Sequence, residues 1–195
     1  MQLKKFVVNL IHVNCYLLWD DTKEAVLIDC GAWFDEEKEN IKQFIEDNGL
    51  TLKHHLNTHL HFDHIFGTTF VEDEYGVRLS ASLDDSAWVT GFAQHIARFG
   101  IQPNTQPRPV GHPLHDGDTL TLGTEELRCL ATPGHSAGGM CFYALGRDML
   151  FAGDTLFHGS IGRTDFADGS YAQLIHSIRN QLLTLPPETI VYPGH

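Results

Sequence analysis

Three histidines and one aspartate fall within six consecutive residues, His59-Leu60-His61-Phe62-Asp63-His64. A segment over 52–57, which we expect to be a strand, leads into them. Side chains two residues apart in an extended chain point the same way, so we expect His59 and His61 to hold one metal ion together. A helical turn after Phe62 would carry Asp63 and His64 to a second metal centre beside the first.

Three later segments share another pattern, in which an apolar strand is followed by glycine and then by a histidine or an aspartate. They are 127–135, 149–154 and 190–195, and they end in His135, Asp154 and His195. Glycine lets the backbone turn sharply and approach a ligand closely, and functional side chains collect in loops that follow rigid strands. Three such endings favour a cluster in which these side chains meet the motif at 59–64.

These side chains divide into two metal sites. Three neutral imidazoles with an open coordination position are typical of a catalytic zinc, and a carboxylate with two oxygens can bridge two ions. The expected sets are His59, His61 and His135 for the first ion, Asp63, His64 and His195 for the second, and Asp154 between them. Imidazole and carboxylate ligands without thiolate suit zinc, and also iron or manganese. We therefore expect two divalent metal ions, with zinc as the first choice.

Composition excludes several classes of protein. The chain has 195 residues, of which 42% are hydrophobic, so we expect one domain with a sizeable core. A net charge of −12 leaves no basic surface for nucleic acid. No apolar run approaches the ~20 residues that cross a bilayer, and we read no signal peptide, so we expect a cytoplasmic protein without a membrane partner. The four cysteines have no paired spacing and are expected to be reduced.

Apolar periodicity predicts the order of strands and helices. The expected strands are 6–10, 14–19, 25–28, 52–57, 119–122, 126–131, 140–145, 149–152 and 189–192. The expected helices are 35–48, which Asn48-Gly49 ends, 82–99, which Ser82 caps with Asp84-Asp85 in its first turn, and 170–185. A proline-rich segment over 100–113 is expected to be a surface loop. This order predicts an α/β fold with two sheets face to face and helices outside.

The seven candidate ligands resemble the pattern of the metallo-β-lactamase superfamily, which is His-x-His-x-Asp-His followed by His, Asp and His. The resemblance spans nearly the whole chain and implies a four-layer αβ/βα sandwich of two mixed β-sheets with outer helices. The segments 132–138 and 151–157 are similar to the glyoxalase II (hydroxyacylglutathione hydrolase) branch. The segment 162–166 is similar to small glyoxalase-II-like and persulfide dioxygenase members.

The resemblance implies a metal-dependent hydrolase that cleaves a small acyl thioester with hydroxide supplied by a dinuclear site. Asp63 would orient that hydroxide and move its proton, and Asp29 is similar to a buried aspartate that supports the motif loop. Full-length glyoxalase II adds a C-terminal helical domain that helps to hold glutathione. We expect residues 1–195 to be a single metallo-hydrolase domain without it. The oligomeric state does not follow from the sequence.

Two further residues are candidates for contact with substrate. Arg163 is placed to reach a substrate carboxylate, or else to brace its loop by pairing with Asp165. Tyr143 would line the pocket, or else pack within its strand. The remaining histidines that we considered have no spacing that joins them to the ligand set, and we expect them not to bind metal: His54, His55, His112 and His115.

Two alternatives to thioester hydrolysis stay open. A persulfide dioxygenase would use the same scaffold with one iron at positions such as His59, His135 and Asp154. A non-catalytic metal-binding scaffold would keep the fold without the reaction. A β-lactamase is disfavoured because we read no signal peptide and because of the segment around Arg163, and a nuclease is disfavoured by the acidic charge.

Overall fold

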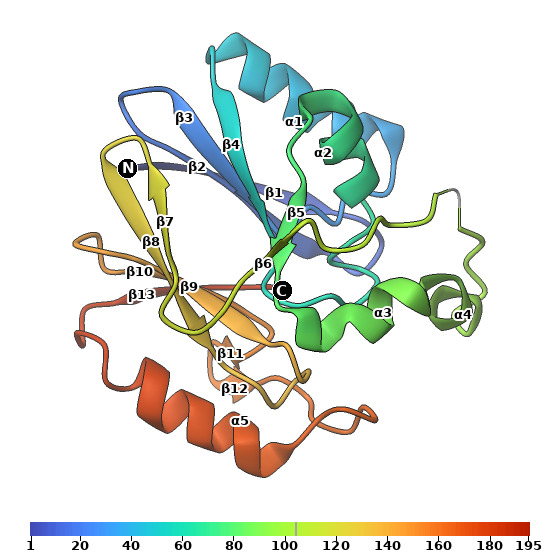
Figure 1. The fold of residues 1–195 in the computed structure, drawn as a ribbon, viewed down its shortest axis with the longest axis vertical. Helices are drawn as coiled ribbons and strands as arrows, with labels where there is room; N and C mark the ends of the chain where they lie inside the picture. The colour runs from blue at the N-terminus through green and yellow to red at the C-terminus, as the bar shows by residue number, and fades with distance from the viewer. Residues whose placement is uncertain (104) are drawn as a thin grey trace.

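The computed structural model describes residues 1–103 and 105–195, and it contains two β-sheets that face each other (Figure 1). In spatial order, the first sheet contains β1 (Gln2–Val8), β2 (Val13–Trp19), β3 (Glu24–Ile28), β4 (Thr51–Leu56), β5 (Leu79–Ala81) and β6 (His112–Pro113). The second contains β13 (Ile190–Pro193), β10 (Met149–Gly153), β9 (Met140–Ala144), β8 (Glu125–Ala131) and β7 (Thr119–Leu122). A short hairpin joins β11 (Leu156–Phe157) to β12 (Ser160–Ile161).

Both large sheets are mixed. In the first, β1, β2 and β3 pair antiparallel, and β3, β4, β5 and β6 pair parallel. In the second, β13 pairs parallel with β10, and the other neighbours pair antiparallel. Because a parallel connection needs a crossover, helices come to lie on the outer faces. The expected sandwich of two mixed sheets is confirmed.

The sequence of β2 shows how the layers form. Along a strand, alternate side chains point to opposite faces. Cys15, Leu17 and Trp19 pack into the core between the first sheet and its helices, whereas Tyr16 and Leu18 pack into the core between the two sheets. Every residue of β2 is therefore buried, as expected for a strand that is covered on both faces.

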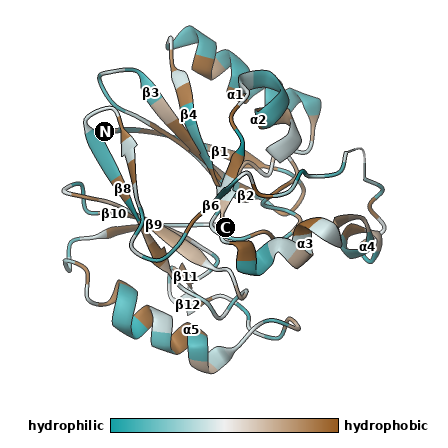
Figure 2. Cartoon of the chain, viewed as in Figure 1, coloured by the Kyte–Doolittle hydropathy of each residue, from teal (hydrophilic) through white to brown (hydrophobic). Residues whose placement is uncertain are grey.

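Helices cover the outer faces of both sheets (Figure 1). The helices α1 (Asp35–Asp47) and α2 (Thr68–Tyr75) pack on the first sheet through Ile41, Ile45 and Val71. The helix α5 (Tyr171–Ser177) continues into the π-helical turn η2 (Ile178–Leu182) and covers the second sheet. Figure 2 shows hydrophobic and hydrophilic residues alternating along α1 and α5, which is typical of helices with one buried face.

The helix that we expected over 82–99 is interrupted. It consists of a 3-10 turn η1 (Leu83–Asp85), α3 (Ser86–Thr90) and α4 (Phe92–Ala97), and the chain bends at Gly91. Glycine is the poorest helix former after proline, so a break there costs little. Ser82 is the N-cap as expected, because its side chain accepts a hydrogen bond from the Asp84 backbone nitrogen at 3.2 Å.

Several elements were not predicted. The helix α2 begins after Gly67 without a side-chain cap, and β5, β6, β11 and β12 are too short to show periodicity. The loop predicted over 100–113 includes β6 at its end, and its residue 104 lies outside the described residues. The helix expected over 170–185 ends earlier, in η2.

The structure bears on two further predictions, one about the cysteines and one about membrane-spanning segments. All four cysteines are buried and free of disulfides: Cys15, Cys30, Cys129 and Cys141. Among the described residues, the helices are too short or too polar for any of them to cross a membrane.

Candidate metal centre

The seven candidate ligands meet at one edge of the two sheets. Four of them lie in the loop that follows β4, and each of the other three lies within four residues of the end of a strand of the second sheet. Asp154 follows β10 and His195 follows β13, whereas His135 lies in the turn after β8. The structure therefore brings together residues that are up to 136 positions apart, since the first is His59 and the last is His195.

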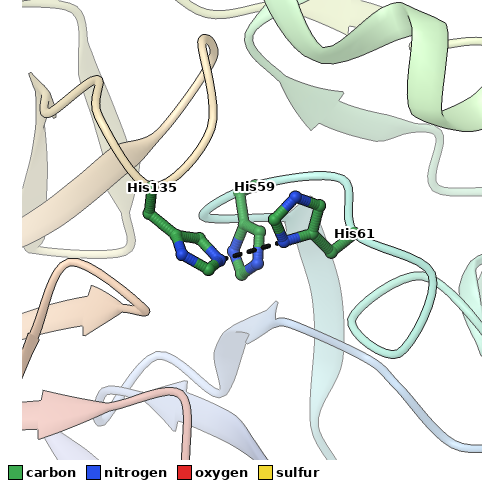
Figure 3. Close-up of side chains that lie close together, drawn as sticks. All are labelled: His59, His61 and His135. Atoms are coloured by element: carbon green, nitrogen blue, oxygen red, sulfur yellow. Dashed lines mark hydrogen bonds between the residues drawn. The ribbon is translucent and has the colours of Figure 1, made fainter. Parts of the chain in front are cut away.

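His59, His61 and His135 form the first group (Figure 3). Each of them offers a ring nitrogen, and these three atoms lie within 4.8 Å of one another. His135 Nε2 lies 2.9 Å from His61 Nδ1, and the rings of His59 and His61 stand nearly perpendicular with centroids 4.6 Å apart. All three residues are buried. The geometry matches a site for one ion with three imidazole ligands.

Asp63, His64 and His195 form the second group, again with ligand atoms within 4.8 Å of one another. His195 Nε2 lies 3.4 Å from Asp63 Oδ2 and 3.4 Å from His64 Nε2. A series of turns over 62–67 carries Asp63 and His64 to this position, and the helix that we expected after Phe62 begins only at Thr68, as α2.

Asp154 lies between the two groups. Its Oδ2 lies 3.6 Å from His135 Nε2, a member of the first group, and 3.5 Å from His195 Nε2, a member of the second. Its Oδ1 lies 3.6 Å from His64 Nε2. Because one carboxylate contacts both groups, Asp154 has the placement that a bridging ligand requires.

Most of the histidine rings are oriented by a contact at the nitrogen that faces away from the centre. This contact fixes the ring and leaves the other nitrogen free for metal. The pairs are His64 Nδ1 with Asp29 Oδ2 at 3.2 Å, His59 Nδ1 with Thr58 Oγ1 at 3.1 Å, His135 Nδ1 with the Arg163 carbonyl at 2.8 Å, and His195 Nδ1 with the Ile11 carbonyl at 3.1 Å. His61 differs, because its Nδ1 is the nitrogen that faces His135.

Unpartnered buried atoms test whether the residues fit metal ions. Among the described residues, His59 Nε2 and Asp154 Oδ1 are buried without a hydrogen-bond partner. Buried polar atoms in folded proteins are nearly always paired, so atoms of this kind that point into one cluster indicate a missing partner with positive charge. The donor set of imidazole nitrogens and carboxylate oxygens fits zinc, iron or manganese.

The electrostatics of the first group favour neutral imidazole, which is the form that binds metal. Burial, reinforced by the neighbouring histidines, lowers the pKa of His59 well below its usual value and that of His61 to about 2. Burial also lowers the pKa of His135. These rings are therefore uncharged at neutral pH, and each has one nitrogen with a lone pair available for metal.

In the second group, the electrostatics favour positive charge. Burial alone would lower the pKa of His64, but the carboxylates of Asp63, Asp29 and Asp154 raise it to about 10. Burial opposes ionisation of Asp63, yet His64 and His195 lower the pKa of Asp63 to about 2. The carboxylates thus favour positive charge at this position, which a divalent ion supplies.

Asp29 lies where the resemblance implied, behind the motif loop. Its carboxylate accepts hydrogen bonds from the Thr58 backbone nitrogen and the Thr58 hydroxyl, both at 2.7 Å, and also contacts His64. Its φ is +53°, a left-handed conformation that aspartate tolerates better than most residues. Such strain persists where the surroundings demand it, often at functional sites.

Sequence reasoning missed two residues that hold the loops of the centre. The Asn9 side-chain nitrogen donates to the Asp63 carbonyl at 3.0 Å and to the Gly31 carbonyl at 2.9 Å. Asp85, which we had placed only in an acidic first turn, is fully buried. Its carboxylate accepts from the Leu60 and Gly138 backbone nitrogens and from the Ser136 hydroxyl. Neither residue shows a local sequence signal, because both act on backbone more than 20 positions away.

The two predicted substrate contacts lie in different places. Arg163 lines a cleft above the centre, where its guanidinium bonds both oxygens of Asp165 at 2.6 Å and lies 4.6 Å from the Phe166 ring centroid. The structure does not bring Tyr143 to this cleft. Tyr143 packs in the core beneath α5 and donates to Asp148 at 3.2 Å, so its side chain has the packing role that we gave as the alternative.

Comparison with known proteins places the chain in a family. The model of the metallo-beta-lactamase superfamily matches residues 8–195. The chain is 35% identical over 196 residues to the hydroxyacylglutathione hydrolase GloC of Haemophilus influenzae, covering all of this chain and 91% of that protein. It is 32% identical over 195 residues to the probable metallo-hydrolase YqgX of Bacillus subtilis, covering all of this chain and 90% of that protein.

Solved structures agree on the fold. The BLEG-1 B3 metallo-beta-lactamase superposes with a TM-score of 0.90 at 35% identity, over all of this chain and 91% of the other. The di-iron-bound form of TTHA1623 superposes with a TM-score of 0.85 at 32% identity, over 98% of this chain and 91% of the other. The chain therefore belongs to the metallo-beta-lactamase superfamily, a superfamily of metallo-hydrolases, and has both its fold and a cluster of histidines and aspartates able to bind metal.

Proposed function

We propose that this protein is a metal-dependent hydrolase that cleaves acyl thioesters of small molecules. The observation that carries the proposal is the convergence of seven histidine and aspartate side chains into two adjacent groups with Asp154 between them. The likeness to a relative named hydroxyacylglutathione hydrolase, over the whole chain, supports the choice of bond.

Two divalent ions would occupy the centre, with zinc as the first choice. The residues that would hold them are His59, His61 and His135 for one, Asp63, His64 and His195 for the other, and Asp154 for both. Iron and manganese suit the same donors, and the similar protein TTHA1623 has been solved in a di-iron-bound form. When bound, such ions lower the pKa of water and stabilise negative charge on oxygen.

Asp63 is the proposed catalytic residue. Its pKa of about 2 keeps the carboxylate ionised at neutral pH, so it accepts a hydrogen bond from the attacking water and orients it. With the ions bound, that water would be acidic enough for its proton to pass by way of Asp63 to the leaving sulfur. The water oxygen forms a bond to the acyl carbon, the carbon–sulfur bond breaks, and the proton ends on the departing thiol. Hydrolysis therefore yields a carboxylic acid and a thiol.

The cleft beside the centre has the size and access that a small substrate needs. It has a volume of about 500 Å³ and reaches His61, Asp63, His135 and Asp154. Volumes in this range are typical of small-molecule sites. Arg163 lies on its rim, and we propose that the guanidinium N–H groups that Asp165 leaves free contact the substrate.

A substrate panel tests the proposal. The metal-loaded protein would be assayed on thioesters, lactones, phosphodiesters and β-lactams, with His61→Ala as the inactive control. We expect metal-dependent hydrolysis of thioesters above all other classes. Hydrolysis of β-lactams alone would contradict the choice of bond, and so would oxygen consumption with a persulfide in a protein that holds one iron. No reaction on any substrate would favour a scaffold.

A further inference from the structure

One wall of the cleft consists of aromatic rings set directly against the first metal group. The Trp88 ring lies 4.3 Å from the His61 ring, centroid to centroid. The Phe166 ring lies 4.5 Å from the His61 ring and 5.6 Å from the His135 ring. Both aromatic residues line the cleft. A group attached to a carbonyl carbon held at this centre would therefore meet aromatic surface first.

Both rings are held in place by neighbouring side chains. The Trp88 indole nitrogen donates to Asp168 Oδ2 at 2.9 Å, so its one polar atom is already paired. The guanidinium of Arg163 lies over the Phe166 ring, and the Trp88 and Phe166 centroids are 5.8 Å apart in an edge-to-face arrangement. A wall that is rigid before binding loses little side-chain entropy when a ligand packs on it.

A second aromatic pair lines the same cleft. The rings of Phe62 and Phe99 have centroids 4.8 Å apart, and both residues line the cleft. Phe99 is 63% exposed, so it contributes little to the core. Together the two rings give the cleft exposed apolar surface, and contiguous apolar surface in a groove is typical of a ligand-binding site.

We propose that this wall, formed by Phe62, Trp88, Phe99 and Phe166, binds the acyl group of the substrate, and that the enzyme prefers aromatic or bulky apolar acyl groups. The proposal rests on the proposed thioester hydrolysis and adds the substrate class. Short hydroxylated acyl groups such as lactoyl would be poorer substrates than these, because the four rings give a hydroxyl no free hydrogen-bond partner and a short chain covers little of their surface.

The test compares acyl groups on one thiol. Phenylacetyl, acetyl and lactoyl thioesters of N-acetylcysteamine would be assayed on the metal-loaded protein. We expect kcat/KM for the phenylacetyl thioester to exceed that for the lactoyl thioester by at least about tenfold, the discrimination that apolar pockets commonly give. Equal values, or a preference for lactoyl, would overturn the inference and leave thioester hydrolysis intact.

Two variants separate binding by the wall from support of the centre. Phe99→Ala should lower the ratio of kcat/KM for the phenylacetyl thioester to kcat/KM for the acetyl thioester about fivefold, mainly by raising KM for the phenylacetyl thioester. Trp88→Leu should lower this ratio as well. Tyr171→Ala is the matched control, because Tyr171 is 64% exposed and does not line the cleft; it should leave the ratio unchanged. Equal losses on both thioesters, together with a lower metal content, would mean that the wall only positions His61, which would overturn the proposal.

Equilibrium binding supplies a readout that does not depend on turnover. Calorimetry would compare the uncleavable thioethers S-phenethyl- and S-ethyl-N-acetylcysteamine on the metal-loaded protein. Tighter binding of the phenethyl compound, weakened in Phe99→Ala, supports the wall even if no thioester is hydrolysed, in which case the proposed function alone fails. Equal affinity for the two compounds overturns the wall.

Discussion

The two sides of the candidate metal centre are built differently. On one side, a single loop after β4 supplies four side chains, and two buried residues outside the loop, Asn9 and Asp29, hold it from behind. On the other side, three side chains come one each from the segments after β8, β10 and β13, so their positions depend on the register of the second sheet.

The most exposed of the proposed ligands lies on the strand side. The side chain of His195 is 27% exposed, whereas that of His64 on the loop side is fully buried, and those of Asp63, His135 and Asp154 lie between them at 11%, 6% and 12%. Because buried groups hold the loop from behind, we expect the loop side to be the more rigid of the two. Substitutions on the loop side should therefore have the larger effects, and the carboxylate of Asp85, which contacts both sides, should matter to each.

We expect the largest loss of activity when a ligand on the loop side, His61, is removed, and a smaller loss when His195 on the strand side is removed. His61→Ala removes a proposed ligand from a buried group, and we expect kcat/KM for a thioester to fall by about a thousandfold or more, since removal of one charge-stabilising group alone often costs about 10²–10³. His195→Ala should cost less. Steady-state kinetics would measure both, with the exposed His115→Ala as a control. A fully active His61→Ala enzyme would end the scheme.

The next effect tests the link between the sides. Asp85→Ala leaves the backbone nitrogens of Leu60 and Gly138 buried without their acceptor. We expect the free energy of unfolding to fall by about 2–4 kcal/mol, because each unpaired buried group costs about 1–3 kcal/mol. Urea denaturation would measure it, with the exposed neighbour Asp84→Ala as the matched control. Equal stability of the two variants would refute the link.

These residues also show what a sequence can predict. The seven proposed ligands were identifiable because metal chemistry restricts residue type and spacing, and long apolar strands were identifiable from alternation. Asp85 and Asn9 were not, because each bonds the backbone of a segment about 50 positions away, and a backbone acceptor or donor leaves no mark in the sequence. The break at Gly91 was missed because apolar periodicity continues through it.

A smaller effect, on metal affinity, tests how Asp29 supports the loop side. Asp29→Asn keeps the size of the side chain and tolerates the left-handed φ, but it removes the charge beside His64 Nδ1. We expect metal affinity to weaken by about 10–100-fold, as is common when the group behind a ligand is changed. Titration against a competing chelator would measure it. Unchanged affinity would show that the loop side needs no charge at this position.

The smallest effect concerns the sheet that carries the motif loop. His55 on β4 is fully buried with neither ring nitrogen paired, and burial lowers its pKa to about 3. The unfolded chain binds the proton with an ordinary pKa near 6.5, so this group removes stability as the pH falls below that value. His55→Leu should gain about 2 kcal/mol relative to wild type between pH 7.5 and pH 5. Denaturation at both pH values would measure it, and a constant difference would contradict the prediction.

Metal content tests the central claim most directly. Elemental analysis of the purified protein after loading and dialysis should give two divalent ions per chain. His135→Ala, which changes only the first group, should lower that number while the second group keeps its ion. One ion per wild-type chain, or none, would contradict the dinuclear centre on which the proposed hydrolysis depends.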